Sequence, residues 1–228
     1  MEFDAFTLAA STADLGDEPA ARGVADCLEF RMDLTDDPLA ALAGYDGELP
    51  ILATNRAAWE GGEWAGTDAE RLEMLAAATR FEAVGAIDVE LQAIVDDGID
   101  TDETLETARE RDVSVVASAH DFEGTPPRGE MVATLTEAIE YADVAKLAVT
   151  AESKADTIAL LSATEQLTHH GDRVATMAMG AVGRHTRAVA PVYGSKIGYA
   201  PVDPAEATAP GQYDLETLSR LVTQLDGE

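Results

Sequence analysis

The sequence is poor in cysteine and in long apolar runs. Cys27 is the single cysteine among 228 residues, which excludes an internal disulfide framework and a multi-cysteine metal cluster and makes this residue a candidate for the core. No run approaches the roughly eighteen uncharged apolar residues that a membrane-spanning helix requires. The opening residues, MEFDAF, carry neither the basic region nor the apolar stretch of a secretory leader. We therefore expect a soluble, cytoplasmic protein without a membrane segment.

Basic residues are also scarce. The chain has 15 lysines and arginines against 44 aspartates and glutamates, a formal net charge of −29. A surface of this sign repels nucleic acid and anionic membranes, so neither is expected as a partner. The acidic residues are spread along the chain, as in DDGIDTDETLETARERD at 96–112, and are not gathered in a tail. At molar salt the Debye length falls to about 3 Å, which screens the repulsion among them. The charge favours a protein of a halophilic cytoplasm, with an ordinary acidic protein as the alternative.

What the sequence does contain is a repeated alternation of short β-rich runs and longer helical runs rich in acidic residues and alanine. The predicted strands are 6–11, 27–33, 50–55, 86–91, 114–120, 144–149, 173–179 and 195–200. Eight β-then-α units without a linker or a break in composition predict an α/β protein with a single (β/α)8 TIM barrel domain over residues 1–228. A doubly wound open sheet is the alternative, but no strand is followed by a phosphate-binding glycine motif. In a barrel, polar residues late in each strand become candidates for the active site.

Charged and apolar residues alternate in the second predicted strand, LEFRMDL at 28–34. A period of two places Glu29, Arg31 and Asp33 on one face. An isolated strand with this pattern is typically a half-exposed edge strand. In a parallel barrel the apolar face packs under helices, so the charged face is turned toward the barrel axis. Because buried charges must be paired or hydrogen-bonded, we predict an ionic network in the barrel interior.

Two strand ends supply further candidates. Arg56 follows the third predicted strand and Glu60 lies four residues later, with a surface Arg–Glu pair as the alternative. His120 ends the apolar fifth strand, whereas His169 and His170 lie in a polar turn. Most single histidines are structural, but histidine transfers protons near neutral pH with little adjustment of its pKa. The position of His120 therefore makes it a candidate general acid/base.

Lys146 interrupts the apolar sixth strand in a chain that has only three lysines. Val144 and Ala148 share its predicted face. Burial and nearby arginines would favour the neutral amine, which attacks carbonyl carbons. The alternative is a lysine whose ammonium reaches out of the barrel into solvent. The scarcity of lysine elsewhere favours an inward, chemically active position.

Two later segments carry polar residues that could serve a site. The loop after the seventh strand, MAMGAVGRHTR at 177–187, contains Arg184 and Arg187. These arginines are either solvated or clamp a carboxylate or phosphate, for which a guanidinium is suited. The segment TAPGQ at 208–212 indicates only a turn when taken alone. The residues before it, PVDPAEAT at 201–208, are loop-like and are a candidate lid.

Six motifs occur in order along nearly the whole chain. They are E-x-R-x-D, R-x-x-x-E-G-G, S-x-H-D-F, a strand lysine in A-K-L-A, M-x(7)-R and A-P-G-Q. Together they resemble type I 3-dehydroquinate dehydratase, the Schiff-base-forming dehydratase of the shikimate pathway. The resemblance implies a (β/α)8 barrel, usually a homodimer, that converts 3-dehydroquinate to 3-dehydroshikimate without a metal or organic cofactor.

The resemblance also implies roles for individual residues. Lys146 matches the Schiff-base lysine that attacks the C3 ketone of the substrate, and His120 matches the general acid/base, which Glu60 orients and charges. Arg187 matches the clamp for the substrate carboxylate. The remaining substrate contacts that the resemblance implies are Ser11, Glu29, Arg31, Arg56, Met179, Thr208 and Gln212.

Three departures from the family pattern bear on these expectations. Thr208 stands where serine is commoner, which leaves the geometry of that contact open, and the similar change at Thr186 is expected to be mild. The chain also begins almost at the first strand, whereas the family commonly closes the barrel bottom with an N-terminal hairpin. We therefore expect a bottom that is more open or is plugged by side chains.

Two other functions stay open from the sequence. Another Schiff-base barrel, such as an aldolase or a transaldolase, would share Lys146 but not the whole set of motifs. A catalytically silent barrel would bind a small carboxylate through Arg187. For any anionic ligand the overall charge of −29 is repulsive. We expect this repulsion to be offset by local positive charge at the entrance of the site, from Arg31, Arg56, Arg184 and Arg187.

Overall fold

The computed structural model describes residues 1–206, 209 and 211–226, and within these ranges eight parallel strands form one sheet. The strands are β1 (Thr7–Thr12), β2 (Cys27–Arg31), β3 (Ile51–Thr54), β4 (Val84–Glu90), β5 (Ser114–Asp121), β6 (Val144–Thr150), β7 (Val174–Met179) and β8 (Ile197–Pro201). Each lies within a few residues of its predicted position. Nearly every strand residue is buried, as is typical of a parallel sheet that is covered by helices.

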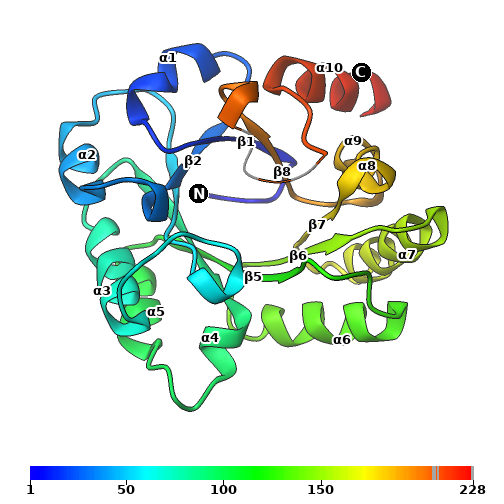
Figure 1. Ribbon diagram of the computed structural model, residues 1–228, viewed down its shortest axis with the longest axis horizontal. Coiled ribbons are helices and arrows are strands. Elements are labelled where there is room, and N and C mark those ends of the chain that lie inside the picture. Colours follow the sequence, from blue (N-terminus) through cyan, green and yellow to red (C-terminus); the bar gives the residue numbers. More distant parts are fainter. Residues whose placement is uncertain (207–208, 210, 227–228) are drawn as a thin grey trace.

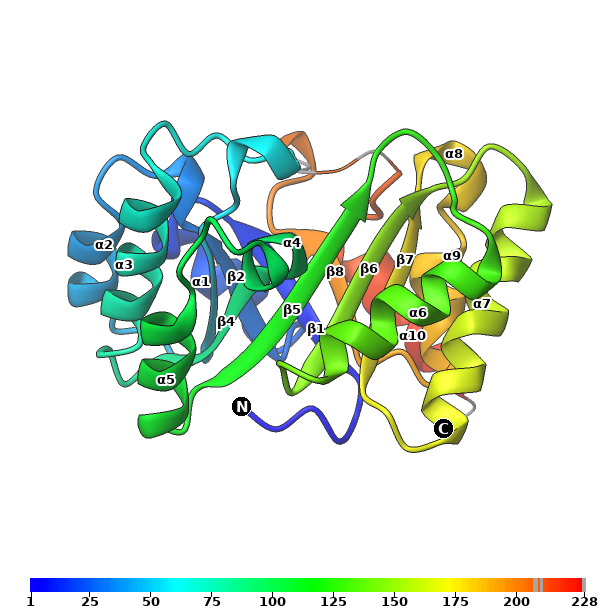
Figure 2. The same ribbon diagram turned by 90° about the horizontal axis from the view of Figure 1, so that it is seen from below.

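The sheet curls into a nearly closed barrel. Neighbouring strands follow the order β7-β6-β5-β4-β3-β2-β1-β8, so β7 and β8 are its two ends. There the backbone amide of Lys196, just before β8, donates a 2.7 Å hydrogen bond to the carbonyl oxygen of Val174 in β7. Figures 1 and 2 show the helices arranged around the outside of the strands. The predicted (β/α)8 barrel is confirmed, and the doubly wound alternative is wrong.

Helices connect the strands. They are α1 (Glu18–Ala21), α2 (Pro38–Gly44), α3 (Asp68–Ala78), α4 (Leu91–Val95), α5 (Asp102–Glu110), α6 (Arg128–Ile139), α7 (Lys154–His169), α8 (Gly180–Gly183), α9 (Thr186–Val189) and α10 (Leu215–Asp226). Short 3-10 helices are η1 (Leu15–Asp17), η2 (Met32–Leu34), η3 (Ala58–Glu60), η4 (Ala190–Tyr193) and η5 (Pro204–Glu206). In the ranges that the structure describes, no helix is both long and apolar enough to cross a membrane.

Side-chain caps fix where two of the longer helices begin. At α3 the amide of Glu70 donates to the hydroxyl of Thr67, and the carboxylate of Glu70 accepts from the amide of Thr67. This reciprocal capping box satisfies two backbone donors that a helix start leaves without partners. Ser153 and Asp156 form the same box at the start of α7. The first turn of α3 is thereby held in place, together with the side chains that it carries.

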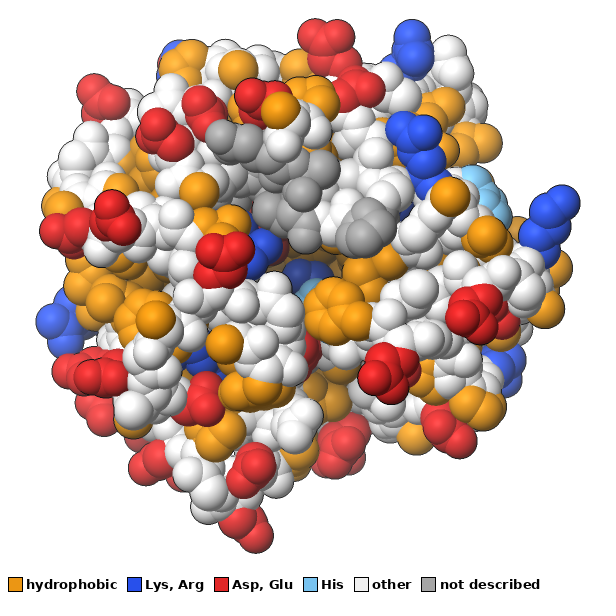
Figure 3. Space-filling view, viewed as in Figure 1, with side chains coloured by type: hydrophobic (Ala, Val, Ile, Leu, Met, Phe, Trp, Pro, Cys, Tyr) orange, Lys and Arg blue, Asp and Glu red, His pale blue; other side chains and the backbone are white. Residues whose placement is uncertain are grey.

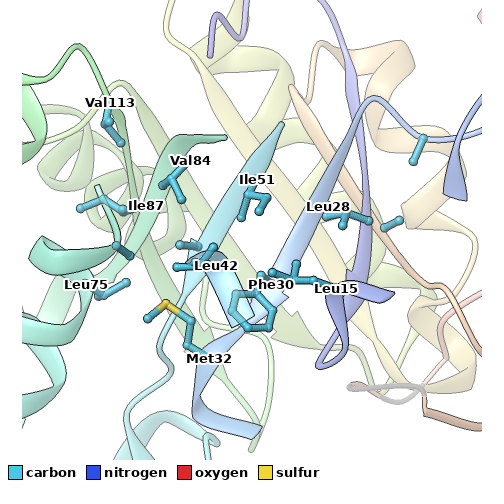
Figure 4. Packing of buried hydrophobic residues seen from close by; sticks show 14 of the residues in the cluster. Leu15, Leu28, Phe30, Met32, Leu42, Ile51, Leu75, Val84, Ile87 and Val113 are labelled. Atoms are coloured by element: carbon cyan, nitrogen blue, oxygen red, sulfur yellow. The ribbon is translucent and has the colours of Figure 1, made fainter. Parts of the chain in front are cut away.

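The layer between the strands and the helices is apolar. Leu28 and Phe30 of β2 and Ile51 of β3 pack with Leu42 of α2 and Leu75 of α3 (Figure 4). In β2 these apolar residues alternate with charged ones, whose side chains are buried on the opposite face and line a cavity inside the barrel. The prediction that the charged face of this strand is turned toward the barrel axis is confirmed.

The bottom of the barrel is closed by side chains and not by a hairpin. Residues 1–6 form no strand and run below the barrel (Figure 2). The amino group of Met1 donates to the carbonyl oxygen of Gly85 (2.8 Å), and the hydroxyl of Ser114 donates to the carbonyl oxygen of Met1 (2.5 Å). Phe3, only 2% exposed, belongs to the cluster of inward side chains that includes Cys27. The expected plug is present, and Cys27 is a core residue as predicted.

Candidate active site

A cavity opens at the C-terminal ends of the strands. It encloses about 570 Å³ of empty space, its open mouth included, which is within the usual range for small-molecule sites. Figure 3 shows basic side chains and a histidine at the bottom of a central hollow, on a face whose outer parts carry many acidic side chains. The predicted site residues that line this cavity are Glu29, Arg31, Arg56, Glu60, His120, Lys146, Met179, Arg187 and Gln212.

Among the described residues, Ser11 is the one predicted site residue that does not line the cavity. Ser11 of β1 is buried, and its hydroxyl donates a 2.5 Å hydrogen bond to the carboxylate of Glu29. It therefore supports a residue that lines the cavity. Thr208 lies outside the described residues, as does all of the candidate lid beyond Glu206.

Lys146 projects from β6 into the cavity. Its side chain is 4% exposed, and its neighbours on the same strand face are apolar, as predicted. Its Nζ lies 2.9 Å from Oδ2 of Asp88 and 3.9 Å from Oε1 of Glu29. The same nitrogen lies over the ring of Tyr199, 4.3 Å from the ring centre. The nearest charges to the amine are therefore carboxylates. The expected nearby arginine is present as well, because Arg56 donates to the other oxygen of the same Asp88 carboxylate (3.0 Å).

Arg56 is the centre of a buried ionic network. Its Nη2 donates to Asp88 (3.0 Å), and its Nη1 donates to Glu90 (3.2 Å) and to the hydroxyl of Ser118 (2.7 Å). Burial lowers the pKa of Arg56, but the two carboxylates outweigh burial and hold this pKa above its ordinary value. Burial likewise raises the pKa of Asp88, but Arg56 and Lys146 outweigh it and hold that pKa below its ordinary value. The interior ionic network predicted from β2 is present, and its centre is Arg56 with the carboxylates of β4.

Sequence reasoning misses Asp88 and Glu90, although a signal for them is present. In the fourth predicted strand, AIDVEL, these residues alternate with apolar ones at the same period of two that singles out Glu29 and Arg31. Both strands therefore turn a pair of charged residues toward the barrel axis. Ser118 carries no such signal, because a serine within an apolar strand is ordinary.

The two charged residues of β2 have different surroundings. Glu29 accepts hydrogen bonds from Ser11 and from the hydroxyl of Thr54 (3.2 Å). Arg31 donates two hydrogen bonds to Asp33, at 2.8 and 2.7 Å, so its charge is already neutralised. Burial raises the pKa of Asp33, but Arg31 outweighs burial and the net shift is downward. Asp33 lies in η2 because the strand ends at Arg31, so its predicted place on the strand face is wrong.

His120 and Glu60 form a close pair at the cavity. Nδ1 of His120 lies 2.7 Å from Oε1 of Glu60, which is the contact predicted for them. The ring of Phe122 stacks on the imidazole, with 5.9 Å between ring centres. Burial, with the positive charges of Arg56 and Lys146, lowers the pKa of His120 well below its ordinary value. Burial raises the pKa of Glu60 to about 8, although the charge of Arg56 opposes this.

These shifts bear on what the pair can do near neutral pH. Glu60 is placed to orient His120, but the surroundings oppose the expectation that it charges the histidine. A neutral imidazole has one ring nitrogen that can accept a proton. The favoured state of His120 is therefore the one that a general base requires.

Arg187 of α9 brings a positive charge to the cavity. Among the residues that the structure describes, no carboxylate pairs with it and its Nε has no hydrogen-bond partner. Burial lowers the pKa of Arg187 to about 10, so the side chain stays charged near neutral pH. A buried cation is stabilised by an anionic partner, which a ligand carboxylate can supply. Arg184 is exposed and stacks over the ring of Tyr213, 4.0 Å from its centre, so it does not belong to the predicted positive lining.

The cavity thus brings together an amine, an imidazole–carboxyl pair and a guanidinium. An amine can form an imine with a ketone, the imidazole can move a proton at a neighbouring carbon, and the guanidinium can hold a carboxylate. Within the described ranges, no group of three His, Cys, Asp or Glu side chains is arranged to hold a metal ion.

Known proteins resemble this chain over nearly its whole length. Residues 7–228 match the sequence profile of the family described as Type I 3-dehydroquinase. A 3-dehydroquinate dehydratase of Haloarcula marismortui is 58% identical over 229 residues, covering 100% of both chains. One of Halobacterium salinarum is 53% identical over 226 residues, covering 99% of this chain and 100% of the relative. Both organisms are halophilic archaea. The crystal structure of 3-dehydroquinate dehydratase from Geobacillus kaustophilus matches with a TM-score of 0.85 at 30% identity, covering 98% of this chain and 92% of that chain.

Proposed function

The chain belongs to the type I 3-dehydroquinase family, and from this membership and the cavity we propose that it dehydrates 3-dehydroquinate to 3-dehydroshikimate through an imine on Lys146. The observation that carries the mechanism is the buried amine of Lys146, which faces the same cavity as the His120–Glu60 pair and the charge of Arg187. The whole chain, 1–228, serves as one catalytic domain in this proposal.

Substrate binding relies first on Arg187. Its guanidinium has no carboxylate partner among the described residues, so the substrate carboxylate completes an ion pair there. The polar side chains of Glu29, Arg56 and Gln212 line the cavity and are assigned to the ring hydroxyls, with Met179 against the ring. Arg31 supports them from its pair with Asp33, and Thr208 is retained as a proposed contact.

Imine formation joins Lys146 to the substrate. The nitrogen of its neutral amine attacks the C3 carbonyl carbon, and the carbonyl oxygen leaves as water after protons are transferred with the help of His120. The product is an iminium, which carries a positive charge on the former Nζ. Asp88, 2.9 Å from this nitrogen in the structure, is placed to stabilise that charge.

Elimination then follows from the iminium. Neutral His120 accepts the proton from C2, and the electron pair of the broken C–H bond flows to the iminium nitrogen to give an enamine. The electrons return to form the C1–C2 double bond as the C1–O bond breaks, and His120 gives its proton to the departing hydroxyl, which leaves as water. A further water hydrolyses the product imine and frees the amine of Lys146, so the sum is the loss of one water.

Borohydride trapping tests this proposal. The protein is incubated with 3-dehydroquinate and borohydride in molar salt, and the reduced adduct is mapped by peptide mass spectrometry. We expect an adduct at Lys146 that disappears in Lys146→Met and persists in Lys154→Met, a control at an exposed lysine. Dehydration without a reduced adduct would reject the covalent mechanism. An adduct without dehydration would favour another Schiff-base barrel enzyme, such as an aldolase.

We further propose a cytoplasmic homodimer that uses no metal or organic cofactor. Family membership supports each of these expectations. Sedimentation equilibrium in molar salt tests the dimer, and turnover after dialysis against a chelator tests the independence from metal. Catalytic silence of the purified protein with 3-dehydroquinate would favour a barrel that only binds a small carboxylate.

A further inference from the structure

Arg71 is fully buried and does not line the cavity. It lies in the first turn of α3, just after the capping box, and its exposed fraction is 0%. Its Nε donates to Asp68 of the same helix (3.0 Å). Its Nη1 donates to the backbone carbonyl oxygen of Asn55 (3.1 Å) and to Oε2 of Glu90 (2.5 Å). An arginine is rarely buried to this degree unless it is paired, and here its partners lead toward the cavity.

Two of these partners hold the backbone next to Arg56, Asn55 on one side directly and Glu90 on the other through Ala57. Asn55 directly precedes Arg56, and its side-chain amide donates back to the carbonyl oxygen of Arg71 (3.2 Å). Glu90 uses its other carboxylate oxygen to accept from Nη1 of Arg56 (3.2 Å) and from the backbone amide of Ala57 (2.9 Å). The backbone on both sides of Arg56, as well as its side chain, is therefore held by Arg71 directly or through Glu90.

Charges of alternating sign continue from Arg71 to the amine of the cavity. The order is Arg71, Glu90, Arg56, Asp88 and Lys146, and consecutive members lie within 3.2 Å. Each inner member is neutralised by a neighbour on either side. Without Arg71, Glu90 keeps Arg56 as its remaining arginine partner. The attraction of Glu90 for Arg56 then becomes stronger relative to that of Asp88, which would shift the position of Arg56.

We propose that Arg71 is a positioning residue of the reaction, which fixes Arg56 at the cavity and Asp88 beside Lys146 from the helix layer outside the barrel. This inference rests on the proposed function of the cavity. A guanidinium suits the role because its rigid, planar set of donors contacts Glu90, Asn55 and Asp68 at once. A lysine keeps the charge but not this geometry.

Steady-state kinetics with 3-dehydroquinate in molar salt provides the first test. We expect kcat to fall about 10- to 100-fold in Arg71→Met, with a smaller change in KM, because displacement of groups around the reacting atoms lowers the rate steeply. Arg71→Lys is expected to lie between Arg71→Met and the wild type. Arg22→Met is the matched control, since Arg22 is partly exposed and forms ion pairs with Glu18 and Glu48, none of which lines the cavity.

The pH profile of kcat/KM provides a second readout that a purely structural role would not move. The charged groups that act on the His120–Glu60 pair are Arg31 from the end of β2, Arg56 after β3, Asp88 and Glu90 of β4, and Lys146 of β6. Arg71→Met leaves one more negative charge unbalanced among them, which favours the protonated state of the pair. The acid limb of the profile is therefore expected to move to higher pH. In the double variant Arg71→Met/Glu90→Gln, which removes one charge of each sign, the acid limb should lie at its wild-type pH again. In Arg71→Lys the acid limb should not move.

The outcomes separate this inference from the proposed function. A wild type that neither dehydrates 3-dehydroquinate nor forms the adduct at Lys146 rejects the function and the role of Arg71 with it. An active wild type whose Arg71→Met variant is folded by circular dichroism, with wild-type kcat and an unmoved acid limb, rejects the role of Arg71 alone. If Arg71→Met does not fold, Arg71→Lys decides, and a wild-type kcat in that variant would overturn the inference.

Discussion

Glu60→Gln should remove a pH dependence of stability that the wild type shows between pH 6.5 and 8. Burial raises the pKa of Glu60 from its ordinary value of 4.5 to about 8, so the folded protein retains a proton that the unfolded chain has released. A group whose pKa is raised by folding contributes stability that is fully present below its ordinary pKa. That contribution is lost as the pH rises through the folded value. The wild type should therefore become less stable across this interval.

The magnitude follows from the proton count. A difference of one bound proton changes the free energy of unfolding by about 1.4 kcal/mol per pH unit. Below pH 6.5, His120 acts in the opposite sense, because its lowered pKa means that the unfolded chain binds the extra proton there. From pH 6.5 to about 8 the opposing contribution of His120 fades and Glu60 dominates, and the expected net loss of stability across the interval is roughly 1 to 2 kcal/mol.

Denaturant unfolding in molar salt at the two ends of this interval measures the effect. Glu60→Gln cannot ionise, so its free energy of unfolding should lose this contribution to the pH dependence. Glu137→Gln, at an exposed position of α6, should keep the wild-type dependence. Equal pH dependence in the wild type and in Glu60→Gln would refute the reasoning, since it would show that Glu60 ionises at the same pH in the folded and unfolded chains.

Three further predictions concern the reaction. His120→Ala should still form the borohydride adduct, but slowly, and kcat should fall by about 10²- to 10⁴-fold because proton transfer is lost; a wild-type turnover number would contradict the role of His120. Arg187→Met should raise KM about 10- to 100-fold, as expected for the loss of hydrogen bonds to a charged group, and an unchanged KM would place the carboxylate elsewhere. Because the substrate is an anion and the protein carries a net charge of −29, kcat/KM should rise with salt up to the molar range while circular dichroism shows an intact fold. A flat or falling salt profile would count against that account.

The fold could be predicted because its signal is local and repeated. Each strand is a short β-rich run between longer amphipathic runs, and the count of eight such units favours a barrel. The placement of Lys146, His120 and Glu60 at the site followed from their positions within or after strands, whereas the pairing of Glu60 with His120 was implied only by the resemblance to the family. Asp33 was misplaced because the strand ends two residues before it, and strand ends are the least certain part of a prediction from sequence.

The charge pairing inside the barrel could not be predicted in the same way. Arg71 lies in a helix whose sequence, DAERLEMLAAA, is typical of a surface helix. Its side chain is buried only because of tertiary packing, which the local sequence does not indicate. Asp88 and Glu90 were open to prediction from their alternation in β4, but which cation each one contacts depends on how far each side chain reaches across the barrel. Period and spacing show which face a side chain occupies, and not its partner on that face.

The carboxylates beside Lys146 add to the expected account of the site. Arginines without such carboxylates would favour the neutral amine, but they would also oppose the positive iminium of the proposed mechanism. In the structure Asp88 of β4 is the near neighbour of the amine, whereas Arg187 reaches the cavity from α9, after β7. Since β4 and β7 are three strands apart in the barrel order, the proposed mechanism has the substrate anion held on one side of the site and the cation formed at Lys146 stabilised from another. In this proposal the barrel separates the residues that meet the two opposite electrostatic demands of the reaction.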